Sequence, residues 1–297
     1  MAETPTYYGL PAVKRSHYGW VIATYFFVGG LAGAAQVIAQ IVDLVGSRED
    51  TQVVRAGRYL ALLGSLISPL LLIRDLHTSS RWFNMLRIFR PTSPMSIGSW
   101  TLAGFGTFSG LAALCEAFGL RRLAALFGLP AAGLGMLMST YTGVLLSATS
   151  TPLWAVAYRQ LPALFGATAV ASADAAMSLT LARSASAPRR ALRRLDHLAL
   201  VAGLAQLAAS WSLERAWKDK HIDPPLAPAQ RVLVQGLGIG FPLLVQALQI
   251  LTGRRWSALN ILSAACTLNG AFLERATLVL AGNRSADRPE DYLRVAS

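Results

Sequence analysis

Long apolar runs, separated by short polar and arginine-rich segments, occupy most of this chain. A helix that crosses a lipid bilayer needs about 20 mainly apolar residues, because each residue advances it by about 1.5 Å. Eight runs approach this length, which predicts an all-α integral membrane protein, a bundle of eight transmembrane helices. The expected spans are about 17–45, 58–73, 97–119, 123–148, 153–182, 195–217, 231–251 and 256–281.

The composition supports a membrane protein that forms a single domain over residues 1–297. The chain is 54% hydrophobic and 14% charged, and its mean hydropathy is +0.44, which is too apolar for a soluble domain of this length. Residues 1–15 are polar and show no short apolar region followed by a small-residue cleavage site. We therefore expect no removable signal peptide, and the first span would itself direct insertion.

The arginines predict the orientation of the bundle. An even number of spans puts both termini on one side, together with the loops at 74–96, 149–152 and 216–228. The loops on the other side contain arginines and little acid, at 121–122, 183–194 and 254–255. The positive-inside rule places these loops in the cytoplasm, so the termini would face the periplasm of a bacterial inner membrane. The net charge of +12 then reflects topology and lipid headgroups, and predicts no nucleic-acid partner.

The metal-binding residue types are too few for a redox centre within this chain. An iron–sulfur cluster needs about four cysteine ligands, and the chain contains only Cys115 and Cys266. None of its four histidines lies in the middle of an apolar run, where a haem between helices would need a pair. We expect neither haem nor an iron–sulfur cluster here, so any metal centre would belong to a partner.

Two tyrosines are predicted to lie at the same depth of the bundle. Tyr25 on the first helix and Tyr141 on the fourth are each roughly 10 Å from the side that carries the termini, at about 1.5 Å per residue. Two hydroxyl groups in an apolar pocket suit hydrogen bonding to the carbonyls of a quinone. The alternative is that both are packed aromatic side chains with satisfied hydroxyls.

Charged residues within or near the spans form a second candidate set, because such groups are costly at membrane depth. They suit a proton relay across the bundle, and they equally suit static ion pairs that hold helices together. The candidates are Asp43, Glu116, Asp174, Arg159, Glu214, Glu274 and Arg275.

The segment 74–96 is predicted to be a structured surface loop where a partner docks. It carries four arginines, one carboxylate and two prolines between two long apolar runs. The alternative role for its cations is contact with lipid headgroups.

Several ordered sequence blocks, spread over nearly the whole chain, resemble the NrfD family, which includes the membrane subunit of polysulfide reductase. They are residues 7–11 (YYGLP), Trp20, 25–33 (YFFVGGLAG), 75–76 (DL), 81–87 (RWFNMLR), 90–100 (RPTSPMSIGSW), 141–147 (YTGVLLS), 152–154 (PLW), Arg275, 281–282 (AG) and 285–286 (SA).

The resemblance implies an eight-helix anchor that binds menaquinone or ubiquinone beside a ferredoxin-like iron–sulfur subunit, itself attached to a molybdopterin oxidoreductase. It places the quinone near the periplasmic face, between the start of the first helix and a tyrosine on the fourth. The quinone-binding candidates are then Tyr141, Tyr25, Thr24, Trp20 and His17. The candidates for partner contact are Asp75, His77, Arg81, Asn84, Arg87 and Arg90.

The expected function is therefore electron exchange between a partner iron–sulfur subunit and the membrane quinone pool, with proton translocation as an additional option. The chain by itself would not be a complete enzyme. A transporter or ion-translocating bundle without a redox partner is the alternative, and it predicts a substrate site near the middle of the membrane. A purely structural anchor is the third option.

Overall fold

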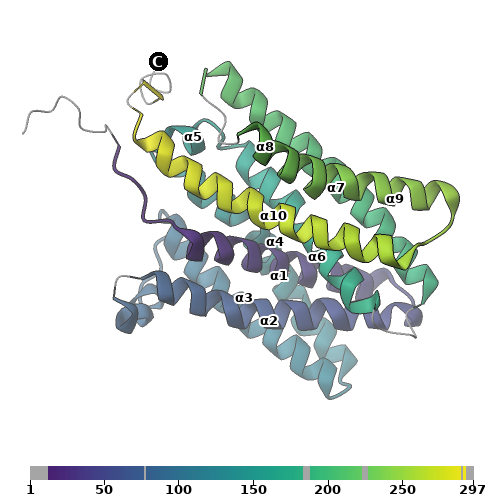
Figure 1. Cartoon of the computed structure of the whole chain (residues 1–297). Coiled ribbons are helices and arrows are strands. Elements are labelled where there is room, and N and C mark those ends of the chain that lie inside the picture. The colour runs from purple at the N-terminus through teal and green to yellow at the C-terminus, as the bar shows by residue number, and fades with distance from the viewer. Residues whose placement is uncertain (1–12, 77, 183–187, 223–226, 289, 292–297) are drawn as a thin grey trace, which may run out of the picture.

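The computed structural model describes residues 13–76, 78–182, 188–222, 227–288 and 290–291, and the regular secondary structure within these ranges is helical. Its long helices run side by side to form one bundle (Figure 1). In chain order the elements are α1 (Trp20–Val45), the 3-10 helix η1 (Arg48–Asp50), α2 (Thr51–Asp75), the 3-10 helix η2 (Ser79–Leu86), α3 (Pro94–Ala117), α4 (Arg121–Ser147), α5 (Pro152–Ala155), α6 (Gln160–Ala182), α7 (Arg189–Asp219), α8 (Pro228–Arg231), the π-helix η3 (Val232–Gly240), α9 (Phe241–Thr252) and α10 (Ser257–Ala286).

Five helical segments in the described part of the chain are long and apolar enough to cross a membrane. They are α1, α2, α4, α6 and the continuous segment Val232–Thr252. The prediction of an all-helical protein with several membrane spans is confirmed.

Different segments of the chain lie at the two ends of the bundle. At one end, the segment before α1 is tied to the end of α10, because Ser16 Oγ lies 2.6 Å from Asn283 Oδ1 and Asn283 Nδ2 donates to the Tyr18 carbonyl at 2.9 Å. We call this the terminal end; η2 and α5 lie there too (Figure 1). The turns 46–50, 118–120 and 253–256 lie at the opposite, arginine-rich end.

Helix α1 lies at the centre of the bundle and contacts α2, α4, α6 and α10. Its glycines and alanines are buried, which allows neighbouring backbones to approach closely. The closest approach is to α4, where Gly33 faces Gly135 and a β-carbon on either would overlap the carbonyl oxygen of the other. Ser139 Oγ donates to the Gly30 carbonyl at 3.3 Å beside this crossing. Small residues therefore decide which helices surround α1.

The fifth and seventh spans are less regular than the sequence predicts. The predicted span 153–182 is divided into α5 and α6 by the turn 156–159, and Pro162 lies in the first turn of α6, where proline is tolerated. The predicted span 231–251 begins as the π-helix η3 and becomes α-helical at Phe241. Pro242 has no N–H to donate to the preceding turn, which is consistent with the wider helix before it.

The second helix begins earlier than predicted. The expected start was residue 58, whereas α2 begins at Thr51. The reason is a local capping arrangement, in which the Ser47 N–H and hydroxyl bond the Asp50 carboxylate at 2.8 and 3.1 Å. As a result Arg58 lies two turns inside the helix.

Substitution of Gly135 by alanine should destabilise the bundle, because the new methyl group would overlap the α1 backbone at Gly33. We expect a loss of about 1–3 kcal/mol, typical of overpacking, seen as a lower thermal midpoint in detergent. Gly133→Ala is the matched control on the same helix, because no neighbouring group lies within 4 Å of the place its β-carbon would occupy. Equal midpoints for the two variants would contradict the role of this crossing.

Candidate functional site

The structure brings Tyr25 and Tyr141 together inside the bundle. Their hydroxyl oxygens lie 2.9 Å apart, and both side chains are buried, Tyr25 on α1 and Tyr141 on α4. Either hydroxyl can donate to the other. The equal depth predicted from the sequence therefore corresponds to direct contact at the start of α1 and near the end of α4, close to the terminal end.

Aromatic side chains hold the tyrosine pair in place. The Phe26 ring lies 5.7 Å from the Tyr25 ring and 6.3 Å from the Phe165 ring, measured between centroids. On the other side, Gly98 of α3 packs against Tyr141, and a side chain at this position would overlap the phenol ring. The pair is therefore rigidly packed, and only glycine permits this distance between α3 and α4.

An apolar cavity of about 210 Å³ lies between α2, η2 and α3, and neither tyrosine is among the residues that line it. One of its walls is Ser99, the neighbour of Gly98. Another is Leu102, which shares a core cluster with Tyr141. The remaining lining residues are Pro69, Leu72, Ile73, Trp82, Met85, Leu86 and Ala103. Such walls suit an apolar ring system that arrives from lipid.

The other predicted quinone-binding residues lie apart from the tyrosine pair. Trp20 is 55% exposed, stacks on Phe272 and lines a separate cavity of about 340 Å³ between α1, η3 and α10. The Thr24 hydroxyl donates to the Trp20 carbonyl at 2.8 Å, within its own helix. His17 precedes α1 and is exposed. Of the five predicted quinone-binding residues, the two tyrosines are therefore the ones that the structure brings together.

The predicted partner-contact surface lies at the terminal end. The side chains of Arg81, Asn84, Arg87 and Arg90 are exposed there, in η2 and the turn that follows it. Asp75 lies at the last position of α2, and His77 is outside the described residues. Large apolar side chains are exposed between these polar ones, namely Trp82, Phe83, Ile88 and Phe89. This mixture of cations and exposed aromatics is typical of a protein-binding surface.

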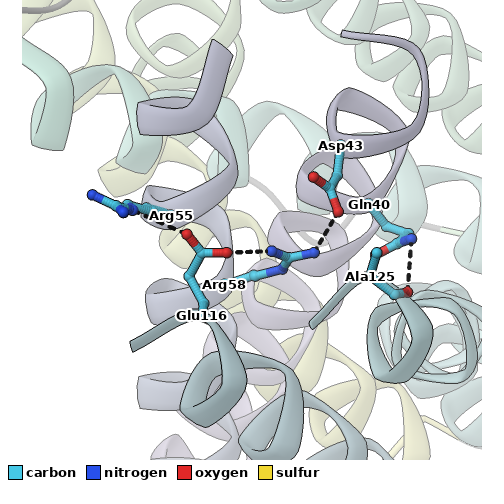
Figure 2. A network of polar contacts seen from close by, with 6 residues as sticks. All are labelled: Gln40, Asp43, Arg55, Arg58, Glu116 and Ala125. Atoms are coloured by element: carbon cyan, nitrogen blue, oxygen red, sulfur yellow. Dashed lines mark hydrogen bonds and ion pairs between the residues drawn. The ribbon is translucent and has the colours of Figure 1, made fainter. Parts of the chain in front are cut away.

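The predicted relay residues Asp43 and Glu116 are joined by an arginine that the sequence analysis did not single out. Arg58 Nη2 donates to Asp43 and its Nη1 donates to Glu116, both at 2.6 Å (Figure 2). Arg55 donates to the other Glu116 oxygen at 3.0 Å. The signal was present in the sequence, since an arginine inside a span needs a carboxylate partner. It was missed because α2 was expected to begin at residue 58.

These four residues, the Arg58 cluster, balance two positive with two negative charges. Arg58 is 1% exposed, and the cluster connects α1, α2 and α3 near the arginine-rich end. Each carboxylate is held by a short, charge-assisted hydrogen bond from Arg58. The geometry favours a static connection between helices over proton transfer.

The other predicted relay acids lie in the second half of the bundle. Glu274 accepts hydrogen bonds from Thr168 at 2.8 Å and from Gln206 at 3.1 Å, and all three side chains are buried. The neighbouring Arg275 donates to the Phe165 carbonyl at 3.0 Å. Asp174 is buried on α6, and its Oδ1 has no hydrogen-bond partner among the described residues. Glu274 and Asp174 therefore remain candidates for proton transfer.

The remaining charged candidates occupy different environments. Arg159 is exposed in the turn before α6, with its guanidinium carbon 5.2 Å from the Tyr158 ring centroid. It is therefore separate from the buried acids, because the break in the fifth span brings it to the surface. Glu214 accepts a hydrogen bond from Gln235 at 2.7 Å, between α7 and η3. Within the described ranges, no group of three or more His, Cys, Asp or Glu side chains could hold a metal ion.

Comparison with known proteins identifies a family. A family model described as polysulfide reductase, NrfD_2, matches residues 4–287. No curated protein matches the chain at a significant level.

Substitution of Arg58 by glutamine should strongly destabilise the protein, because it removes the partner of the Asp43 carboxylate and one of the two partners of the buried Glu116 carboxylate. We expect about 3–5 kcal/mol, measured as a lower thermal midpoint in detergent. Arg55→Gln is the control on the same helix, since this side chain is 51% exposed and its ion pair is worth about 1 kcal/mol or less. Similar midpoints for both variants would show that the buried pairs do not hold the helices together.

Proposed function

Because the chain belongs to the NrfD_2 polysulfide reductase family, we propose that it is the membrane anchor and quinone-binding subunit of a respiratory oxidoreductase complex. It exchanges electrons between a ferredoxin-like iron–sulfur subunit, itself joined to a molybdopterin subunit, and the quinone pool. The observation that carries this proposal is the buried Tyr25–Tyr141 pair, which packs on Gly98 of α3, the neighbour of Ser99 in the wall of an apolar cavity.

The tyrosine pair suits a menaquinone or ubiquinone headgroup. Only one of the two hydroxyl protons can lie between the two oxygens, so the other is available to a carbonyl acceptor. The apolar walls at Leu72, Trp82 and Leu102 suit the ring and the start of its tail. A bound quinone would supply two-electron, two-proton chemistry. Tyr141 would orient it by hydrogen bonding, and Tyr25 would hold Tyr141.

The partner would dock on η2, because some side chains of η2 line the apolar cavity and others are exposed on the outer surface. Trp82, Met85 and Leu86 line the apolar cavity, while Arg81 and the following turn are exposed to the outside. A partner on this surface would be separated from the quinone by a single layer of protein. The exposed arginines favour an acidic partner surface.

Eight transmembrane helices remain our proposal for the topology. Beyond the five apolar segments, α3, α7 and α10 have 24, 31 and 30 residues, which is enough to cross a bilayer at about 1.5 Å per residue. The arginine-rich end would face the cytoplasm and the terminal end the periplasm, across a bacterial inner membrane.

Replacing Tyr141 by phenylalanine should slow quinone turnover about ten-fold while the complex still assembles. The variant keeps the ring that packs on Gly98 and removes one hydrogen-bonding group, whose loss corresponds to about 1.4 kcal/mol. Steady-state reduction or oxidation of a soluble quinone analogue by the purified complex measures the effect.

The matched control is Tyr59→Phe, because Tyr59 is an exposed tyrosine on α2. It should retain the turnover of the unmodified complex. Unchanged turnover and quinone affinity in Tyr141→Phe would remove this tyrosine from the mechanism.

Purification of the chain from its native membrane in mild detergent tests the assembly. We expect an iron–sulfur protein, a molybdopterin subunit and extractable quinone to copurify, as identified by mass spectrometry. Alanine at both Arg81 and Arg87 should weaken retention of the partner, because it removes two exposed cations from the docking surface. A lone chain without quinone, under conditions that preserve other membrane complexes, would instead favour the transporter.

A further inference from the structure

A small polar cavity lies between α6, α7, η3, α9 and α10, away from the tyrosine pair. Its volume is about 30 Å³, enough for one or two water molecules. Its polar lining contains one carboxylate, three side-chain amides and three hydroxyl groups: Asp174, Gln206, Gln246, Asn260, Ser178, Ser263 and Thr267. Polar side chains inside a membrane bundle are costly and usually have a function, so this concentration of polar groups requires an explanation.

Three of these side chains have atoms that no group in the described protein satisfies. They are Asp174 Oδ1, Gln246 Oε1 and Asn260 Nδ2, on residues that are 2%, 8% and 7% exposed. Leaving such groups unpaired is costly, so buried polar atoms are normally satisfied by protein or by water. Two of the three atoms are acceptors and one is a donor. A water molecule donates two hydrogen bonds and accepts from N–H groups, whereas a metal ion would be repelled by the Asn260 N–H.

The cavity has a polar connection toward the arginine-rich end. Gln249 lies three residues after Gln246 on α9, about 4.5 Å further along the same face. Its side-chain amide is also buried without a protein partner. It lines a surface pocket of about 120 Å³ together with Asp196, His197 and Arg255, in which Arg255 and Asp196 form an ion pair at 3.1 Å.

On its inner side the cavity reaches Glu274. Gln206 of α7 lines the cavity and donates to the Glu274 carboxylate at 3.1 Å. Asp174 therefore lies between a surface pocket with a charged rim and a second buried acid. By contrast, the carboxylates of the Arg58 cluster are already ion-paired.

We propose that Asp174, Gln246 and Asn260 bind a buried water molecule, and that Asp174 exchanges a proton with the arginine-rich end through this water and Gln249. The step is a simple proton transfer, in which a hydronium ion protonates the carboxylate and leaves a neutral water. The proposal deepens the proposed function, because quinone chemistry takes up and releases protons. The site itself does not depend on quinone.

Direct observation of the water tests the binding site. In a cryo-EM map of the purified complex that resolves water, we expect density within hydrogen-bonding distance of both Asp174 Oδ1 and Gln246 Oε1. A dry cavity, or a direct hydrogen bond between these two side chains, would overturn the proposal. The map requires no bound quinone, so failure of the quinone assignment would leave this result intact.

Infrared difference spectroscopy tests the proton exchange. On a pH change, the complex should show a carboxyl C=O band that Asp174→Asn removes, and the band should shift after transfer to deuterated water. Gln249→Leu should slow this shift several-fold, because it replaces the polar connection with an apolar side chain.

Gln36→Leu is the matched control, since Gln36 is an equally buried glutamine with an unpartnered amide, located on α1. It should leave the rate of the shift unchanged. If Asp174→Asn removes no band at any accessible pH, or if Gln249→Leu and Gln36→Leu behave alike, Asp174 does not exchange a proton by this route. The band is read without turnover, which separates this result from any loss of quinone activity.

Discussion

Every polar group inside this bundle must find its partner within the protein or in trapped water, because the hydrocarbon of a bilayer offers none. This constraint explains the arrangement of the charged side chains. Arg58 is tolerated because two carboxylates meet it, and Glu274 because a hydroxyl and an amide donate to it. Where the described protein leaves a group unmatched, as at Asp174, the constraint itself identifies a place for water.

Two regions of the bundle satisfy their buried polar groups in different ways. In the first four helices the buried charges are neutralised in pairs and the tyrosine hydroxyls bond each other, so the polar groups form a rigid frame beside an apolar cavity. Between α6, α7, α9 and α10 the polar groups are mainly uncharged amides and hydroxyls around one carboxylate. A frame with satisfied charges suits positioning of a lipid-soluble ligand, whereas neutral polar groups around a single acid suit movement of a proton.

The two regions meet at α1 and α6, where small residues bring the backbones together. A β-carbon at Gly30 of α1 would lie 3.1 Å from the Arg275 guanidinium, which in turn donates to a carbonyl of α6. The same helix presents Tyr25 to Tyr141 on another face. A change in the packing of α1 would therefore act on the tyrosine pair and on the second half at once, which is a reason for its many small buried residues.

The sequence by itself determined the helical membrane architecture, the family and the equal depth of the two tyrosines. Apolar runs report helix length, and depth follows from counting residues along a helix, which is why the meeting of Tyr25 and Tyr141 could be anticipated. Only the tertiary structure decided which residues at equal depth face each other. It joined Asp43 and Glu116 through Arg58, separated Trp20 from the tyrosines and brought Arg159 to the surface. The physical reason is that helix rotation and neighbour choice depend on close backbone contacts between distant segments, such as Gly33 with Gly135, which no local pattern encodes.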